Sequence, residues 1–293
     1  MTYDVLVIGG SYAGLSAALQ LVRARRSVLV VDAGRRRNRF ASHAHGFLGQ
    51  DGVDPAEFAR RARAELEAYP TLAFHEGEVT AASGAKDAFV ATTADGSRHA
   101  ARRILLATGV SDRLPPVEGI AERWGRGVYH CPYCHGYELD EGAIGVVGAG
   151  AMSLHQAEMA SEWGRVTLLA NGAVPLDAEA RASLDRYGVA VEETPVARIC
   201  GTADVLLQDG RMLAFAGLFT IPVSAPSSPV ASELGCEIEE TPFGTQIRTD
   251  ATKETTVPGA FACGDVARVP HSLALAVGDG AFAGAAVHRS LVF

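Results

Sequence analysis

Apolar residues gather in short runs along this chain, at positions 5–8, 28–31, 104–107, 144–147 and 166–170. Such runs, with almost no polar face, are typical of parallel strands that are buried on both sides. The segments 15–25 and 151–163 separate two pairs of these runs and are predicted to be helices. The pattern therefore predicts an α/β protein built from β-α-β units.

Further elements complete the prediction. Asp54 and Pro55 form an N-cap and a first-turn proline, and so mark the start of a helix. We expect a helix at 57–67, strands at 72–79 and 88–93 around a glycine-containing turn, a strand at 103–109, a linker at 113–116, alternating strands and turns at 190–220, a short strand at 260–265 and a terminal helix at 273–291.

Two of the β-α-β units repeat each other with an offset of 139 residues. Gly9 aligns with Gly148, Ser11 with Gly150, Gly14 with Ser153 and Asp32 with Asn171, without a gap over 23 residues. A repeat of this kind predicts two Rossmann-like nucleotide-binding folds.

The first unit carries a glycine loop suited to a dinucleotide. Gly9 allows the tight turn, Gly14 allows close packing of helix and strand, and Ser11 and Ala13 lie where the loop approaches a diphosphate. Such a phosphate would face the free N–H groups and dipole of the helix N-terminus. Asp32, at the end of the second strand, can accept hydrogen bonds from ribose hydroxyls.

The second unit has a glycine loop without the usual partners. Gly148, Gly150 and Ser153 form the loop, but Asn171 replaces the acid that would bind an NAD ribose. Residues 170–180 contain no lysine or arginine for an NADP phosphate. This unit either binds a nicotinamide cofactor weakly or is a scaffold that has lost one.

A C-x-x-C-H motif precedes the second unit: Cys131-Pro132-Tyr133-Cys134-His135. Two thiols at this spacing can form and break a disulfide, and one is often acidified. Haem attachment would normally need export, zinc would need four well-placed ligands, and the two cysteines could also be inert. A redox dithiol is the preferred interpretation, and no metal is expected.

Composition limits the partners. The 293 residues suggest about two domains, and a net charge of −8 with Arg35–Arg37 as the longest basic run makes nucleic acid an unexpected partner. No apolar stretch approaches the roughly 20 residues that a membrane span needs. The chain enters a strand directly after its first residues, which leaves no room for a targeting peptide, so we expect a cytoplasmic protein.

With these residues in place, the chain resembles the low-molecular-weight thioredoxin reductase family of flavoproteins. The family order of motifs is present from end to end: Gly9–Gly14, Ala107-Thr108-Gly109, Cys131–Cys134, Gly148–Ser153 and Gly264-Asp265. The resemblance implies an FAD domain of residues 1–112 plus 243–293, with Gly264 and Asp265 at the FAD, and an inserted NAD(P)-binding-like domain of 113–242. It also implies a homodimer.

The chain departs from that family at two places. Pro132, Tyr133 and His135 replace the usual Ala, Thr and Asp of the motif, and Ala170-Asn171-Gly172 replaces arginine-containing sequence. Both changes resemble a sub-branch of FAD-dependent dithiol oxidases that form disulfides in small natural products such as gliotoxin and holomycin. Electron flow from a small dithiol to FAD and reduction of a thioredoxin-like protein by NADPH or NADH both remain open, as does a non-catalytic FAD-binding sensor.

Roles for the motif follow from the same resemblance. Cys134 would face the flavin and Cys131 would exchange with substrate, while His135, with an ordinary pKa near 6.5, is the candidate base. The weaker candidates are His43, His45, His130 and His271. The remaining cysteines, Cys200, Cys236 and Cys263, are expected to be buried as small hydrophobic residues.

Overall fold

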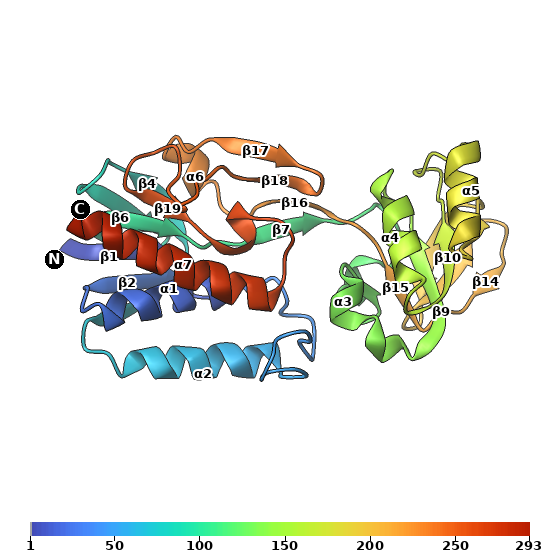
Figure 1. Cartoon of the computed structure of the whole chain (residues 1–293), viewed down its shortest axis with the longest axis horizontal. Coiled ribbons are helices and arrows are strands. Elements are labelled where there is room, and N and C mark those ends of the chain that lie inside the picture. The colour runs from blue at the N-terminus through green and yellow to red at the C-terminus, as the bar shows by residue number, and fades with distance from the viewer. Residues whose placement is uncertain (1) are drawn as a thin grey trace.

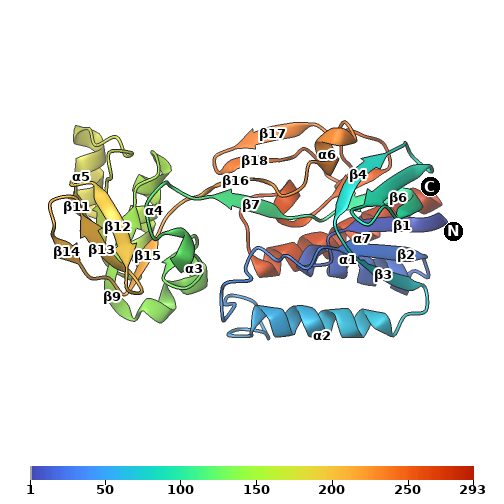
Figure 2. The ribbon, with the colours of Figure 1, turned by 180° about the vertical axis from the view of Figure 1, so that it is seen from behind.

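The computed structural model describes residues 2–293, which form two α/β bodies. Two antiparallel neighbouring strands, β7 (Val110–Arg113) and β16 (Val223–Pro226), connect the bodies side by side (Figures 1 and 2). The second body is thus inserted between two parts of the first, as the sequence predicts. No helix among the described residues is long and apolar enough to cross a membrane.

The main sheet of the first body is largely parallel. Its strands are β1 (Thr2–Ile8), β2 (Val28–Asp32), β3 (Leu72–Glu76), β6 (Arg98–Leu106) and β19 (Ala260–Ala262), with β4 (Val79–Ser83) and β5 (Phe89–Thr93) added antiparallel beyond β6. The expected single strand at 72–79 is wrong. The chain changes partner at Gly77, because β3 pairs with β2 whereas β4 pairs with β5.

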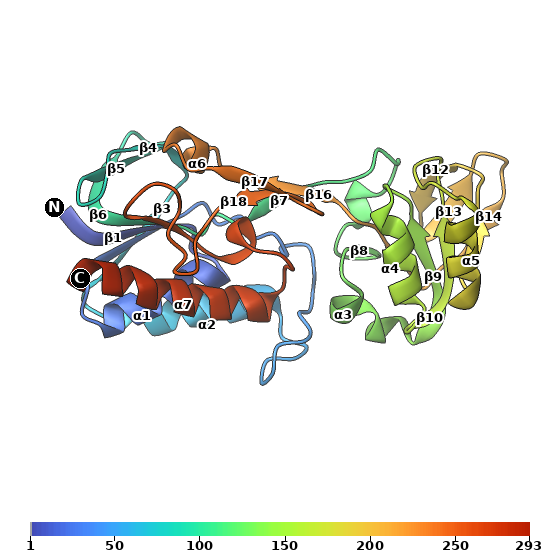
Figure 3. The same ribbon diagram turned by 45° about the horizontal axis from the view of Figure 1, so that its top comes forward.

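Three helices cover one face of this sheet: α1 (Tyr12–Arg23), α2 (Pro55–Glu67) and α7 (Leu273–Val292). Asp54 caps α2 by accepting hydrogen bonds from the N–H groups of Ala56 and Glu57. Helix α7 lies along α1 (Figure 3). It approaches so closely that a Cβ at Gly280 would clash with the Ala13 carbonyl.

A smaller sheet and a helix cover the other face. They comprise β7, β16, β17 (Ile238–Thr241), β18 (Gly244–Ile247) and α6 (Val230–Glu233). Val230 and Cys236 are buried in one core cluster with Leu6 and Ile8 of β1. The expected domain boundary at residue 243 remains a prediction, but this packing favours an earlier return to the first body, near β16.

The second body repeats the design at smaller scale. Its parallel sheet contains β8 (Val128–Tyr129), β9 (Glu141–Val147), β10 (Gly164–Leu169), β11 (Ala190–Glu192) and β15 (Gly217–Phe219), and a small antiparallel sheet contains β12 (Val196–Cys200), β13 (Asp204–Leu207) and β14 (Met212–Leu213). Its helices are α3 (Pro132–His135), α4 (Met152–Ala160) and α5 (Ala178–Arg186). The 3₁₀ turns η1 (Ala121–Arg123) and η2 (Tyr137–Leu139) also belong to this body, whereas η3 (Gly264–Ala267) belongs to the first.

The predicted pair of Rossmann-like folds is confirmed. The units β1-α1-β2 and β9-α4-β10 share parallel pairing and the same strand-turn-helix order. They differ in the helix after the glycine loop, which has 12 residues in α1 and 9 in α4.

Candidate active site

The first glycine loop is shaped by two close backbone approaches. Gly9 has a φ of 105°, and a Cβ there would clash with the Ala107 carbonyl. A Cβ at Gly14 would clash with the Gly9 carbonyl. Ser11 is the N-cap of α1 but its side chain makes no capping hydrogen bond. The loop therefore keeps a hydroxyl and a helix N-terminus available to an anion.

This loop opens into a cavity of about 560 Å³. Most predicted site residues line it together: Gly9, Ser11, Ala13, Asp32, Ala107, Thr108, Gly109, Cys131, Cys134, His135, Gly264 and Asp265. Gly14 supports the loop from behind, and Gly148, Gly150 and Ser153 do not line the cavity. The fold thus brings the dithiol of the second body to the same space as the glycine loop of the first.

The dithiol turn holds its two sulfur atoms 2.6 Å apart. Cys131 occupies the N-cap position of α3, and its carbonyl accepts the Cys134 N–H at 3.1 Å. The hydrogen bond from the Cys134 thiol lowers the pKa of Cys131 most, and the Arg37 charge acts in the same direction while burial opposes both. The same bond and burial raise the pKa of Cys134. Cys131 is therefore the more acidic thiol.

Two buried imidazoles flank the dithiol. His135 stacks on Tyr129 with ring centroids 4.3 Å apart, and burial, aided by the nearby His45, lowers the pKa of His135 to about 4. Burial and the Arg37 charge likewise lower the pKa of His130 to about 4. The Nδ1 atom of each ring is buried without a hydrogen-bond partner. Both histidines are thus neutral at physiological pH and could each accept a proton.

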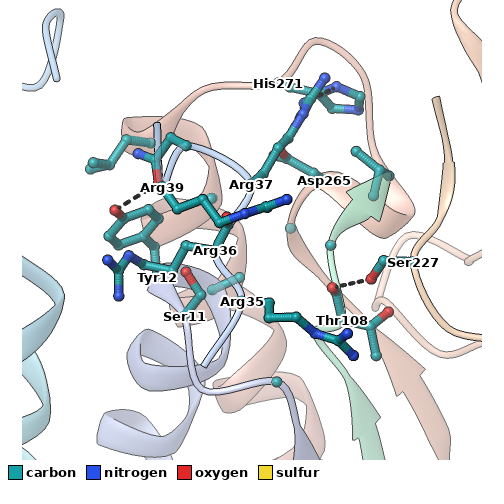
Figure 4. Close-up of a pocket in the computed structure, with 18 of the residues that line it drawn as sticks. Ser11, Tyr12, Arg35, Arg36, Arg37, Arg39, Thr108, Ser227, Asp265 and His271 are labelled. Atoms are coloured by element: carbon teal, nitrogen blue, oxygen red, sulfur yellow. Dashed lines mark hydrogen bonds and ion pairs between the residues drawn. The ribbon is translucent and has the colours of Figure 1, made fainter. Parts of the chain in front are cut away.

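A charged network borders the other side of the cavity. Arg37 donates to both carboxylate oxygens of Asp112, at 2.8 and 2.7 Å, and to Asp265 at 3.0 Å. Its Nη1 atom also lies 2.7 Å from Nδ1 of His271 (Figure 4). Burial lowers the pKa of Arg37, but the pairing with the two aspartates outweighs this effect and raises it. Arg37 therefore holds Asp265 of η3 against β7, the strand that leads to the second body.

Comparisons with known proteins agree with this geometry. Residues 3–280 match the family model described as pyridine nucleotide-disulphide oxidoreductase. The chain is 32% identical to thioredoxin reductase sirT of Leptosphaeria maculans, covering 98% of this chain and 93% of that protein. This chain belongs to the pyridine nucleotide-disulphide oxidoreductase family.

Solved structures of similar proteins extend the agreement to the whole fold. An oxidoreductase from Agrobacterium tumefaciens matches with a TM-score of 0.98 at 56% identity, over 100% of this chain and 99% of that one. HlmI matches with a TM-score of 0.91 at 35% identity, over 99% and 93%. The chain is a disulfide oxidoreductase of the thioredoxin reductase type, and the predicted resemblance to that family is confirmed.

Around the second glycine loop, Ser153 and Asn171 form hydrogen bonds within the protein. The Ala149 N–H donates to the Ser153 hydroxyl at 3.0 Å, and the Gly148 N–H donates to the Leu169 carbonyl at 2.8 Å. Asn171 has a φ of 54°, and its side-chain oxygen accepts the Val196 N–H at 2.9 Å. The Gly148 bond has a counterpart in the first loop, where the Gly9 N–H donates to the Val31 carbonyl at 2.8 Å, so the difference between the loops lies in the engaged Ser153 hydroxyl and Asn171 side chain.

Four arginines line the cavity although the sequence pattern did not predict them there. Arg35, Arg36, Arg37 and Arg39 surround the cavity near Ser11 and Tyr12 (Figure 4). Their signal was visible as the longest basic run of an acidic chain, directly after Asp32. In the sequence this run bears only on nucleic-acid binding, for which it is too short, because nothing in the sequence shows that this loop folds over the glycine loop.

The other histidine and cysteine predictions have mixed outcomes. His43, His45, His130 and His271 all line the cavity. Cys236 and Cys263 are buried as expected, but Cys200 is only partly buried, with its sulfur 3.8 Å from that of Met212 on the small sheet. Among residues 2–293, no group of three or more histidine, cysteine or acidic side chains is arranged to hold a metal ion.

Proposed function

We propose that this protein is an FAD-dependent dithiol oxidase, in which the Cys131–Cys134 disulfide accepts electrons from a small dithiol. The observation that carries the proposal is the shared cavity: the two cysteines line the same space as Ser11 and Asp32 of the first glycine loop. Both thiols face this space in the present arrangement, so a small substrate suits them better than a protein surface.

The residues around the cavity fit FAD. Ser11 and the α1 N-terminus would meet the diphosphate, Asp32 the adenosine ribose, and Gly264 and Asp265 the ribityl region. The Nε atom of Arg36 is buried without a partner, which suits an anion nearby. When bound, FAD supplies a two-electron acceptor next to the dithiol.

Chemistry begins with the protein's own disulfide. A substrate thiolate attacks the Cys131 sulfur, the Cys131–Cys134 bond breaks, and its electron pair leaves on Cys134. The second substrate thiol then attacks the mixed disulfide at the substrate sulfur, which releases the Cys131 thiolate and the oxidised substrate. Two protons leave the substrate, and the protein disulfide becomes a dithiol.

The electrostatics of the site support these roles. The lower pKa of Cys131 suits the thiol that must leave the mixed disulfide, because a more acidic thiol is a better leaving group. His135 is proposed as the transient acceptor of a substrate proton because it follows Cys134 directly, lines the same cavity and has a buried Nδ1 atom without a partner, while burial makes it a weaker base than a free imidazole.

The runner-up is an NADPH-dependent thioredoxin reductase. The names of several relatives favour it, including that of sirT. The engaged Ser153 and Asn171 side chains disfavour it, because NAD(P)H binding at this loop would have to displace bonds that the protein makes internally. A non-catalytic sensor fits less well, since it gives no reason for a dithiol at the cavity.

Anaerobic flavin reduction tests the proposal. Dithiothreitol should bleach the flavin absorbance of the FAD-loaded protein at least tenfold faster than equal NADPH or NADH, and Cys134→Ser should abolish bleaching by the thiol. Air should restore the absorbance if oxygen is the acceptor. Rapid bleaching by micromolar NADPH would return the protein to the runner-up function, and a flavin that no thiol reduces would favour the sensor.

A further inference from the structure

Helix α4 follows the second glycine loop and would normally direct its N-terminus at a dinucleotide phosphate. Here the Ser153 hydroxyl accepts the Ala149 N–H at that end. Ala157 and Ala160 are fully buried in the core cluster of the second body, so α4 is firmly seated on its sheet. The helix is therefore firmly placed, and the loop before it is held to Ser153.

The same helix contacts the dithiol turn before its first cysteine. The Gln156 side chain donates from Nε2 to the His130 carbonyl at 2.8 Å, directly before Cys131. Gln156 is only 5% exposed, and its Oε1 atom is buried without a partner. An unpartnered buried carbonyl costs free energy, so a leucine would stabilise the core more simply. The amide is thus better explained by its hold on His130.

A second contact lies at the other end of the turn. The Trp163 ring, seven residues after Gln156, meets Tyr133 edge-on at 5.1 Å between centroids. It lies so close to Gly136 that a Cβ there would be 2.7 Å from two ring carbons. The Gly136 N–H in turn donates to the Pro132 carbonyl and closes the turn. Helix α4, through Gln156, and the turn after it, through Trp163, therefore contact the dithiol turn on both sides of the two cysteines.

We propose that α4 and the turn that follows it brace the dithiol turn, with Gln156 of the helix and Trp163 of the turn as positioning residues that set the redox equilibrium of Cys131 and Cys134. The proposal rests on the redox role of the two cysteines in the proposed function. It assigns the helix of the second nucleotide-like unit a role in holding the thiols in place.

The direct test compares Gln156→Ala with His155→Ala, an exposed neighbour on the same helix, in the FAD-loaded protein. The Cys131–Cys134 pair is equilibrated with glutathione buffers, and its oxidised fraction is read by thiol alkylation and mass spectrometry. Gln156→Ala should shift the equilibrium constant about tenfold, which is ~30 mV for a two-electron couple. His155→Ala should stay within about twofold.

Gln156→Glu separates positioning from packing. A protonated glutamic acid can donate to the His130 carbonyl, but an ionised one cannot. The variant should therefore resemble the parent at low pH and Gln156→Ala at high pH, a dependence that a packing role would not produce. Trp163→Phe should shift the equilibrium by a smaller amount, with Glu162→Ala as its control, and it provides a second measurement if Gln156→Ala does not fold.

The outcomes distinguish the two proposals. Equilibria within twofold of the parent for Gln156→Ala and Trp163→Phe would overturn the brace. The glutathione equilibrium needs no electron transfer to flavin, so it can be read even if dithiothreitol fails to bleach the flavin. That failure would overturn the proposed function and leave the brace measurable.

Discussion

The two glycine loops of this protein share one strand-turn-helix pattern, and neither helix has a side-chain cap, but the loops differ in the hydrogen bonds of their polar side chains. At the first loop, Ser11 makes no capping hydrogen bond and faces a cavity. At the second, Ser153 and Asn171 accept hydrogen bonds from Ala149 and Val196 of the same body. A loop binds an anion only if its donors are free, so sequence similarity between the loops does not make them equivalent sites.

The second unit instead contributes the dithiol to the cavity. Its sheet and α4 carry the segment 129–136, which reaches the cavity of the first body. One unit thus supplies free donors for a cofactor, and the other supplies a supported dithiol. A repeated fold can thus keep its architecture in both copies while the polar groups of each copy take different partners.

A carboxylate placed in each loop should affect FAD binding very differently. Ser11→Asp should weaken FAD binding at least about hundredfold, or ~2.7 kcal/mol, because a carboxylate would face the diphosphate. Aspartate is a good N-cap, so α1 should still form. Ala149→Asp, in the exposed second loop, should retain its flavin. Flavin content and FAD titration measure both; equal losses would contradict the comparison.

The pH dependence of His135 tests the chemical role of the second unit. His135→Ala should slow dithiol-driven flavin reduction about ten- to hundredfold, because a proton acceptor is lost. Since burial lowers the pKa of His135 to about 4, the ring is neutral above about pH 5 and is protonated as the pH falls through 4. The parent-to-variant rate ratio should therefore stay constant from about pH 5.5 to 8 and decline towards pH 4.

Stopped-flow reduction by dithiothreitol across that range provides the measurement. The exposed His155→Ala variant, on α4, is the control and should react like the parent. A rate ratio that collapses near pH 6.5 would show that His135 titrates like a solvent-exposed histidine, and a ratio near one throughout would remove it from the mechanism.

A smaller effect, on NADH affinity, is expected from variants that release polar groups of the second loop. Ser153→Ala frees the Ala149 N–H, and Asn171→Asp adds a ribose acceptor while it can still accept the Val196 N–H. Each change should improve NADH affinity about fivefold, since one net hydrogen bond contributes about 1 kcal/mol. Fluorescence titration of NADH gives the affinities, with Asn171→Ala as the control that gains nothing. No gain in the double variant would mean that something else closes this loop.

Local elements of this chain can be predicted from its sequence, whereas long-range pairings cannot. The glycine pattern and the 139-residue repeat were enough to predict both β-α-β units, because strand, turn and helix are specified locally. The segment 72–79 was predicted wrongly, because the choice of partner strand is a long-range decision. The contribution of Arg37 was missed for the same reason, since its partners Asp112 and Asp265 lie 75 and 228 residues away.

The amino-acid sequence specifies the available chemistry: two thiols at disulfide spacing, an adjacent imidazole, one complete glycine loop and one without its acidic partner. Short-range spacing and residue type specify these features. The three-dimensional structure adds what the sequence does not specify. It places the dithiol and the first loop in one cavity, and burial keeps His130 and His135 neutral. It also places Ser153 and Asn171 where they accept hydrogen bonds within the protein. Desolvation and hydrogen-bond satisfaction depend on every neighbour in space, and the sequence pattern does not name those neighbours.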